Sequence, residues 1–123
     1  MENIEKRHYA VIDPYQRKLT LKYNDQIIAE STHALILKEV AKTVYDPVFY
    51  IPKEDVKVEL EKEAGRHSAC PIKGDATYWN LKTQPTSDYF AWSYEEPLPR
   101  TKKIESLIAF NPAYISFLSE PLS

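Results

Sequence analysis

Apolar and polar residues alternate in several short runs along this chain, which is the pattern of half-buried β-strands. The first clear runs are Leu19–Tyr23, Gln26–Ser31 and Ala34–Lys38. Between the first two stand Asn24 and Asp25, which tolerate the left-handed backbone of a tight hairpin. We therefore expect these three runs to form successive strands of a meander.

The later part of the chain repeats the strand pattern. It predicts strands at Val48–Ile51, Val56–Leu60, Asp75–Leu81, Tyr89–Tyr94 and Leu107–Phe110. Tyr114–Leu118 is expected to form a terminal strand or to lie across the core. Between the strands we expect short helical turns at Pro52–Asp55 and Thr101–Ser106, a polar connector at Glu61–Gly65 and a candidate flap at Lys82–Asp88.

These patterns predict a mainly β fold. It should be a compact antiparallel sandwich or open barrel of short strands with one or two short helical turns. The length of 123 residues fits one domain, so we expect a single domain over residues 1–123.

Charge and composition exclude several classes of protein. The net charge of −2 argues against a nucleic-acid partner, because such binding needs clustered positive charge. No apolar run reaches the length of a membrane span, and the charged N-terminal segment leads into no signal-peptide core. One cysteine and three dispersed histidines provide neither an internal disulfide nor a zinc site. We expect a cytoplasmic protein without a membrane partner or a bound metal.

The stretch from Arg66 to Leu81 holds the greatest chemical variety, including the only cysteine, Cys70. Pro71 forces the residue before it into an extended conformation, and Gly74 permits a positive φ. The sequence therefore predicts a kinked strand pair with Lys73 and Gly74 at the bend.

Strand alternation assigns the side chains of this stretch to two faces. Ser68, Cys70 and Ile72 should share one face, and His67 and Lys73 the other, unless a bulge resets the phase.

The spacing Ser68-x-Cys70-Pro71-x-Lys73-Gly74-x-Ala76-x-Tyr78-Trp79 resembles the signature of the domain-of-unknown-function family 427, which some annotation labels nucleotidyltransferase-like. Three more stretches are similar to that family: Ile28–Ser31, Tyr50–Val56 and Ala91–Pro97. Ile72 departs from the family pattern, since an aromatic residue is usual there. The resemblance covers nearly the whole chain and implies a small, mostly β fold with no settled activity or cofactor.

Three residues are candidates for catalysis. Cys70 is a candidate nucleophile, which His67 or Lys73 would activate by favouring the thiolate. Asp55 belongs with Glu30, Asp75 and Glu95, which come from four separate stretches that resemble the family. If two of these carboxylates converged, they would serve acid–base chemistry or hold a divalent ion. The alternative is a buried, unreactive cysteine and solvated acids.

Six residues are candidates for ligand binding: Lys73, Gly74, Asp75, Tyr78, Trp92 and Tyr94. A lysine beside a glycine bend suits an anion, and aromatic side chains with polar tips suit pocket walls. We predict that Lys73, Tyr78, Trp92 and Tyr94 line one cleft. The alternatives are core packing for the aromatic residues and an ion pair with Asp75 or Asp55 for Lys73.

Three functions remain open on the sequence alone. The first is a domain that binds a small anionic molecule in this cleft. The second is a homodimeric interaction module without catalysis, built on exposed aromatic residues and edge strands near Pro71. The third is a nucleotidyl- or phosphoryl-handling enzyme, which needs at least two carboxylates close to Lys73. Whether the protein is an enzyme is not determined by these patterns.

Overall fold

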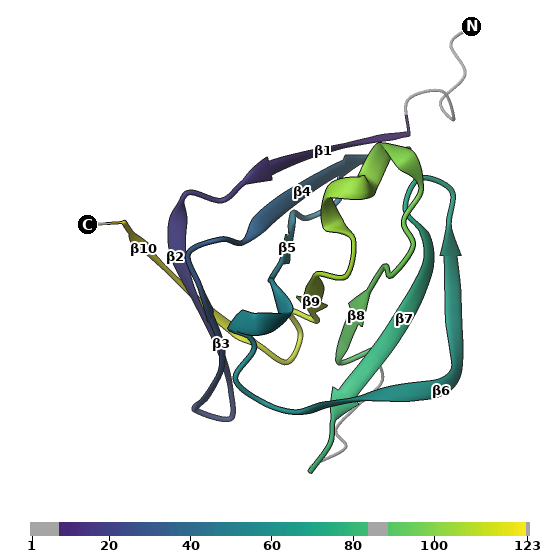
Figure 1. Cartoon of the computed structure of the whole chain (residues 1–123). Coiled ribbons are helices and arrows are strands. Elements are labelled where there is room, and N and C mark those ends of the chain that lie inside the picture. Colours follow the sequence, from purple (N-terminus) through teal and green to yellow (C-terminus); the bar gives the residue numbers. More distant parts are fainter. Residues whose placement is uncertain (1–7, 84–88, 123) are drawn as a thin grey trace, which may run out of the picture.

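The computed structural model describes residues 8–83 and 89–122 and shows a mainly β protein (Figure 1). Most of the flap expected at Lys82–Asp88 lies outside these ranges. The strands are β1 Tyr9–Pro14, β2 Arg17–Tyr23, β3 Gln26–Ser31, β4 Leu35–Val40, β5 Val48–Tyr50, β6 Leu60–Cys70, β7 Gly74–Leu81, β8 Ala91–Ser93, β9 Ile108–Phe110 and β10 Ser116–Pro121. Two 3-10 helices complete the described elements, η2 Lys53–Asp55 and η3 Pro99–Ile104.

The strands form three antiparallel sheets, with the orders β1-β4-β5, β10-β2-β3 and β6-β7-β8-β9. An isolated bridge between Ile51 and Ile108 joins the first sheet to the third. The sheets curve around one another without closing into a barrel (Figure 1). The expected mainly β, antiparallel fold with short helical turns is therefore confirmed.

The first hairpin forms where the sequence predicts it. Asn24 and Asp25 have φ values of 49° and 65°, the left-handed conformation expected between β2 and β3. The predicted meander is wrong, however, because β4 pairs with β1 and β5 instead of β3. An alternating pattern identifies a strand and its buried face but not its partner. The pattern also missed β1.

The segment before the central motif differs from its prediction. Only the end of the predicted strand Val56–Leu60 lies in a sheet: Leu60 begins β6 and pairs with Leu81, whereas residues 56–59 belong to no described strand. In this segment Val56 makes a single bridge to Ala29, and Lys57 N–H donates to the Ile28 carbonyl. The expected connector at Glu61–Gly65 is instead part of the long edge strand β6. Its polar composition reflects the exposure of an edge strand, and Gly65, with φ of +78°, lies where the register to β7 shifts.

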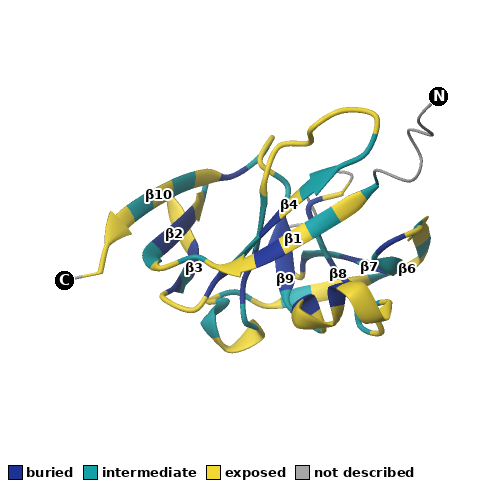
Figure 2. Cartoon of the chain, turned by 90° about the horizontal axis from the view of Figure 1, so that it is seen from above, coloured by how far each residue is buried: buried dark blue, intermediate teal, exposed yellow. Residues whose placement is uncertain are grey.

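Two clusters of buried residues form the core, and the four-stranded sheet contributes to both. Tyr78 pairs with Trp92 across β7 and β8, and both pack with the second cluster. Trp79, one residue later on β7, packs against the first cluster. Buried positions concentrate on β2, β3, β8 and β9, whereas β1, β6 and β10 are mostly exposed along their length (Figure 2). Neighbouring residues of the motif thus serve opposite faces of one sheet.

Candidate functional site

A hollow of about 390 Å³ lies on the face of the sheet that carries Tyr78 and Trp92. We call it the aromatic cleft, and its lining residues are Lys73, Tyr78, Tyr89, Trp92, Tyr94 and Asn111. The structure therefore brings together the four residues that the sequence assigned to one cleft. The volume falls within the range of roughly 300–1,000 Å³ that is usual for small-molecule sites.

The turn that carries Lys73 is held in place through its backbone. The Thr101 hydroxyl, on η3, donates a hydrogen bond of 3.0 Å to the Ile72 carbonyl. The Leu98 N–H donates to the Lys73 carbonyl at 3.2 Å. Thr101 is only 1% exposed, so its hydroxyl satisfies a carbonyl that water does not reach from that side. Helix η3 and the residue before it thus fix the backbone position of Lys73.

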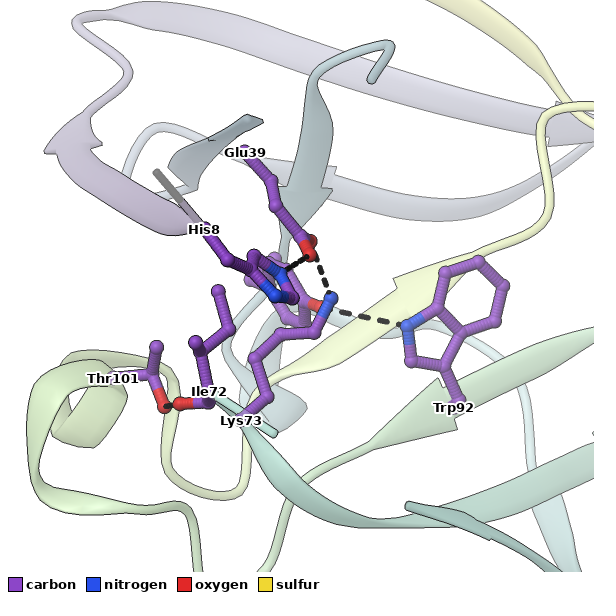
Figure 3. Close-up of polar contacts among 7 residues, drawn as sticks. His8, Glu39, Ile72, Lys73, Trp92 and Thr101 are labelled. Atoms are coloured by element: carbon purple, nitrogen blue, oxygen red, sulfur yellow. Dashed lines mark hydrogen bonds and ion pairs between the residues drawn. The ribbon is translucent and has the colours of Figure 1, made fainter. Parts of the chain in front are cut away.

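The Lys73 ammonium is fixed by an ion pair that the sequence did not indicate. Its Nζ lies 2.8 Å from Oε1 of Glu39, near the end of β4. The second carboxylate oxygen, Oε2, lies 2.8 Å from Nε2 of His8 (Figure 3). Lys73 Nζ also lies 5.6 Å from the centre of the Tyr94 ring. The partner of Lys73 is therefore Glu39, and not Asp75 or Asp55, which the sequence offered as alternatives.

The pKa of Glu39 reflects these contacts. Burial alone raises the pKa of this carboxyl, because it disfavours the charged form. The hydrogen bonds from Lys73 and His8, together with their positive charges, lower it further than burial raises it. The net pKa of Glu39 lies below its usual value, so the carboxylate stays ionised at neutral pH.

Two tyrosines next to Lys73 have the opposite shift. Burial raises the pKa of the Tyr94 hydroxyl, and the nearby Tyr50 and Cys70 groups raise it further. Burial likewise raises the pKa of Tyr50, partly offset by a hydrogen bond from the Trp92 indole N–H to the Tyr50 oxygen at 3.4 Å. Both phenols therefore keep their protons at neutral pH.

The lining residues Tyr78 and Tyr89 are also held in place by neighbouring side chains. The Tyr78 and Ser68 hydroxyls share a hydrogen bond of 2.6 Å. The Tyr78 and Tyr89 rings meet edge to face, with their centres 5.1 Å apart. The Arg66 guanidinium lies 4.5 Å from the centre of the Tyr89 ring, within cation–π range. These contacts hold the rings in place without a ligand.

The expected division of the motif into faces is only partly right. His67 lines a different hollow of about 440 Å³, together with Gly74 and Asp75. Lys73 does not share that face but lines the aromatic cleft. Strand alternation ends at Cys70, and the intervening turn redirects Lys73 toward the side of Tyr78. Gly74 has the predicted positive φ, +98°, but neither Gly74 nor Asp75 lines the aromatic cleft.

The catalytic candidates do not assemble into one centre. Cys70 is a half-buried free cysteine that packs against the second core cluster, whereas His67 lines the other hollow. Asp55 lies on η2 and accepts a hydrogen bond of 2.7 Å from the Ser31 hydroxyl. None of these contacts links Cys70 to a base.

The other predicted carboxylates also lie apart from Lys73. Glu30 pairs with Lys18 at 3.6 Å, and Glu95 pairs with Lys53 at 3.0 Å. Glu95 also accepts a hydrogen bond from Ser93, which in turn accepts one from the Trp79 indole N–H on the opposite face. Burial raises the pKa of Glu95, but its hydrogen bonds from Ser93 and Lys53 bring it below the usual value. Residues 8–83 and 89–122 contain no group of three or more His, Cys, Asp or Glu side chains arranged to hold a metal ion.

Sequence reasoning missed four residues that build the cleft and its surroundings: His8, Glu39, Tyr50 and Asn111. Glu39 is 34 residues from Lys73 and looks like any acid at a strand end. Only the pairing of β4 with β1 and β5 brings it close to the turn, and no local pattern encodes that pairing.

Comparison with known proteins gives one family match. The family model described as domain of unknown function (DUF427) matches residues 11–120. No curated protein matches the chain. No helix among the described residues is long and apolar enough to cross a membrane.

Proposed function

The chain belongs to the family described as domain of unknown function (DUF427), and we propose that it binds a small anionic molecule in the aromatic cleft. One observation carries this proposal: a concave hollow exists with Lys73 in its wall and aromatic side chains around it. An apolar-walled hollow with a few convergent polar groups is the usual composition of a small-molecule site.

The charge of the ligand follows from the one charged side chain in the lining. Among the described residues, Lys73 alone brings a formal charge to this hollow. Its ammonium has three N–H donors, and the structure assigns one of them to Glu39. Glu39 does not line the cleft, so it positions the lysine side chain without occupying the site. A carboxylate or phosphoryl oxygen would accept a hydrogen bond from the remaining donors.

The rest of the lining favours a ligand that also carries a planar or apolar part. Tyr78, Tyr89, Trp92 and Tyr94 offer ring surfaces, and Asn111 offers an amide that both donates and accepts. Aromatic pairs prefer offset or edge-to-face contacts, which a flat ligand can make with several of these rings. A sugar or ring bearing an acidic group fits this description.

The homodimer alternative receives less support from the surface near Pro71. The nearby edge strand β6 exposes Glu61, Lys62, His67 and Ser68, a polar series that discourages strand pairing. Oligomeric state stays a prediction that sedimentation would check.

The enzyme alternative requires several carboxylates near Lys73. Among residues 8–83 and 89–122, Glu39 is the one carboxylate in contact with Lys73, and it is already shared with His8. Phosphoryl or nucleotidyl transfer therefore lacks the support that it needs from this arrangement.

A thermal-shift screen with matched ligand pairs tests the proposal. Each anion is compared with its neutral counterpart: nucleotides with nucleosides, sugar phosphates with free sugars, and aromatic carboxylates with their amides. We expect at least one anion to raise the Tm while its neutral counterpart does not, because only a ligand preferred by the folded state stabilises it. Absence of any anion-specific shift would contradict the proposal.

The matched variant is the double substitution of Lys73→Met with Glu39→Gln. It removes both charges of the ion pair together, so no uncompensated charge stays buried. The anion-specific shift should disappear in the double variant. The same shift in the variant would place the ligand elsewhere.

A further inference from the structure

A third hollow is lined in part by the turn that carries Lys73. It measures about 520 Å³, and Pro71 and Ile72 form its apolar part. His8, Lys42, Tyr45 and Arg100 supply the polar part. We call it the basic hollow, because the described lining contains two permanently cationic side chains, a histidine and no carboxylate.

The cationic groups of the basic hollow come from three separate parts of the chain. His8 precedes β1, Lys42 follows β4, and Arg100 lies on η3. An anion bound in this hollow would be attracted by the cationic side chains of its lining. Within the described ranges neither Lys42 nor Arg100 takes part in an ion pair, whereas Lys38, Lys73 and Lys102 do.

The chemistry of these groups selects the class of ligand. Arginine presents a planar fork of N–H donors that matches phosphoryl oxygens, and lysine adds a point charge. The half-exposed Tyr45 offers a phenol that donates or accepts a hydrogen bond. We propose that the basic hollow is a second anion site, which binds the phosphoryl group of a small molecule.

The two hollows share one structural connection. Glu39 accepts from Lys73 of the aromatic cleft through Oε1, and it contacts His8 of the basic hollow through Oε2 (Figure 3). Ile72 and Lys73 are consecutive residues of one turn, and each lines a different hollow. The basic hollow is nevertheless a separate site, since its lining shares no residue with that of the aromatic cleft.

Calorimetric titration with inorganic pyrophosphate tests this site directly. The full chain is compared with Lys42→Gln and Arg100→Gln, each of which removes one exposed cation of the hollow. Each variant should weaken pyrophosphate binding on the order of tenfold or more, which corresponds to loss of one hydrogen bond between charged groups. Circular dichroism confirms that both variants stay folded, as expected for exposed positions.

Lys103→Gln is the matched control, because Lys103 is an exposed residue of η3 that does not line the hollow. It should bind pyrophosphate as the unchanged protein does. A sulfate titration at equal ionic strength separates phosphoryl binding from general charge attraction, and sulfate should bind more weakly. No binding of pyrophosphate, or equal weakening in all three variants, would overturn the proposal.

Discussion

Nζ of Lys73 lies 2.8 Å from Oε1 of Glu39, and the two side chains are only 13% and 12% exposed. This largely buried ion pair links the turn after β6 to the end of β4. Removing water from two charges is costly, and their attraction repays that cost only when both are present. The intact pair therefore adds little net stability, but loss of either partner leaves an unpaired buried charge. This cost keeps the Lys73 ammonium beside Glu39.

The ion pair leads to a prediction about single and double substitutions. Glu39→Gln should lower the free energy of unfolding by about 2 to 4 kcal/mol, because it leaves the Lys73 charge partly buried without a carboxylate. Lys73→Met should cost a similar amount for the converse reason. Urea unfolding of the double variant should show a smaller loss than the sum of the two. Strict additivity would show that the two charges do not interact.

The lowered pKa of Glu39 predicts acid sensitivity. The folded protein binds fewer protons at this carboxyl than the unfolded chain, so stability rises with pH in the range where the carboxyl titrates. The contribution is fully present above the ordinary glutamate pKa of about 4.5 and is lost as the pH falls through the lower folded value. Unfolding free energies measured between about pH 3 and pH 7 should fall on the acid side.

Glu39→Gln is the variant that isolates this effect. Its pH profile should be flatter than that of the unchanged protein, but not flat, because the pKa of Glu95 is also lowered. Identical pH profiles of the two proteins would show that Glu39 does not contribute to the loss of stability in acid.

The bond between Thr101 and the Ile72 carbonyl predicts a role for a single buried hydroxyl. Thr101→Val keeps the shape of the side chain but leaves this carbonyl without its donor, and should cost about 1 to 3 kcal/mol. Thr101→Ser retains the hydroxyl and should restore most of the bond. Chemical denaturation of the two variants measures the difference. Equal stability of the valine and serine variants would argue against the bond.

The bend itself can be tested at Gly74, where φ is +98°. Gly74→Ala should destabilise the fold by about 1 kcal/mol or more, because a side chain strains this backbone conformation. A built Cβ would also lie 3.4 Å from the Glu96 carbonyl oxygen. Gly65→Ala is the comparison: its φ is +78° and nothing lies within 4 Å, so only backbone strain applies. Thermal unfolding should rank Gly74→Ala as the more damaging change.

Much of the fold can be predicted from the sequence because its signals are local. Alternation located most strands, and Asn24 and Asp25 identified their hairpin. Alternation reports an extended segment with two faces, whether or not it has a hydrogen-bonded neighbour. It therefore predicted a strand at residues 56–59, which belong to no described strand, and it paired β4 wrongly.

The candidate site also contains residues that nearby sequence predicts and residues that only the tertiary fold brings together. Lys73, Tyr78, Trp92 and Tyr94 were predictable because a glycine bend and two aromatic strands lie close in sequence. Glu39 and His8 could not be predicted, since they lie on or next to strands of the first sheet, far before Lys73 in the sequence. Gly74 and Asp75 line another hollow, because adjacent residues at a turn can face different hollows.

Tryptophan fluorescence tests the central proposal most directly, because the two tryptophans lie on opposite faces of the sheet. Trp92 lines the aromatic cleft, whereas Trp79 lies beside Lys53, at 5.6 Å from its ring centre to Nζ. Trp79→Phe leaves Trp92 as the only reporter, and Trp92→Phe leaves only Trp79. Both variants are titrated with the anion that gives the largest anion-specific Tm shift. We expect saturable change in the emission of the Trp79→Phe variant and none in that of the Trp92→Phe variant. A change confined to the Trp92→Phe variant, or no change at Trp92 despite binding, would contradict a ligand in the aromatic cleft.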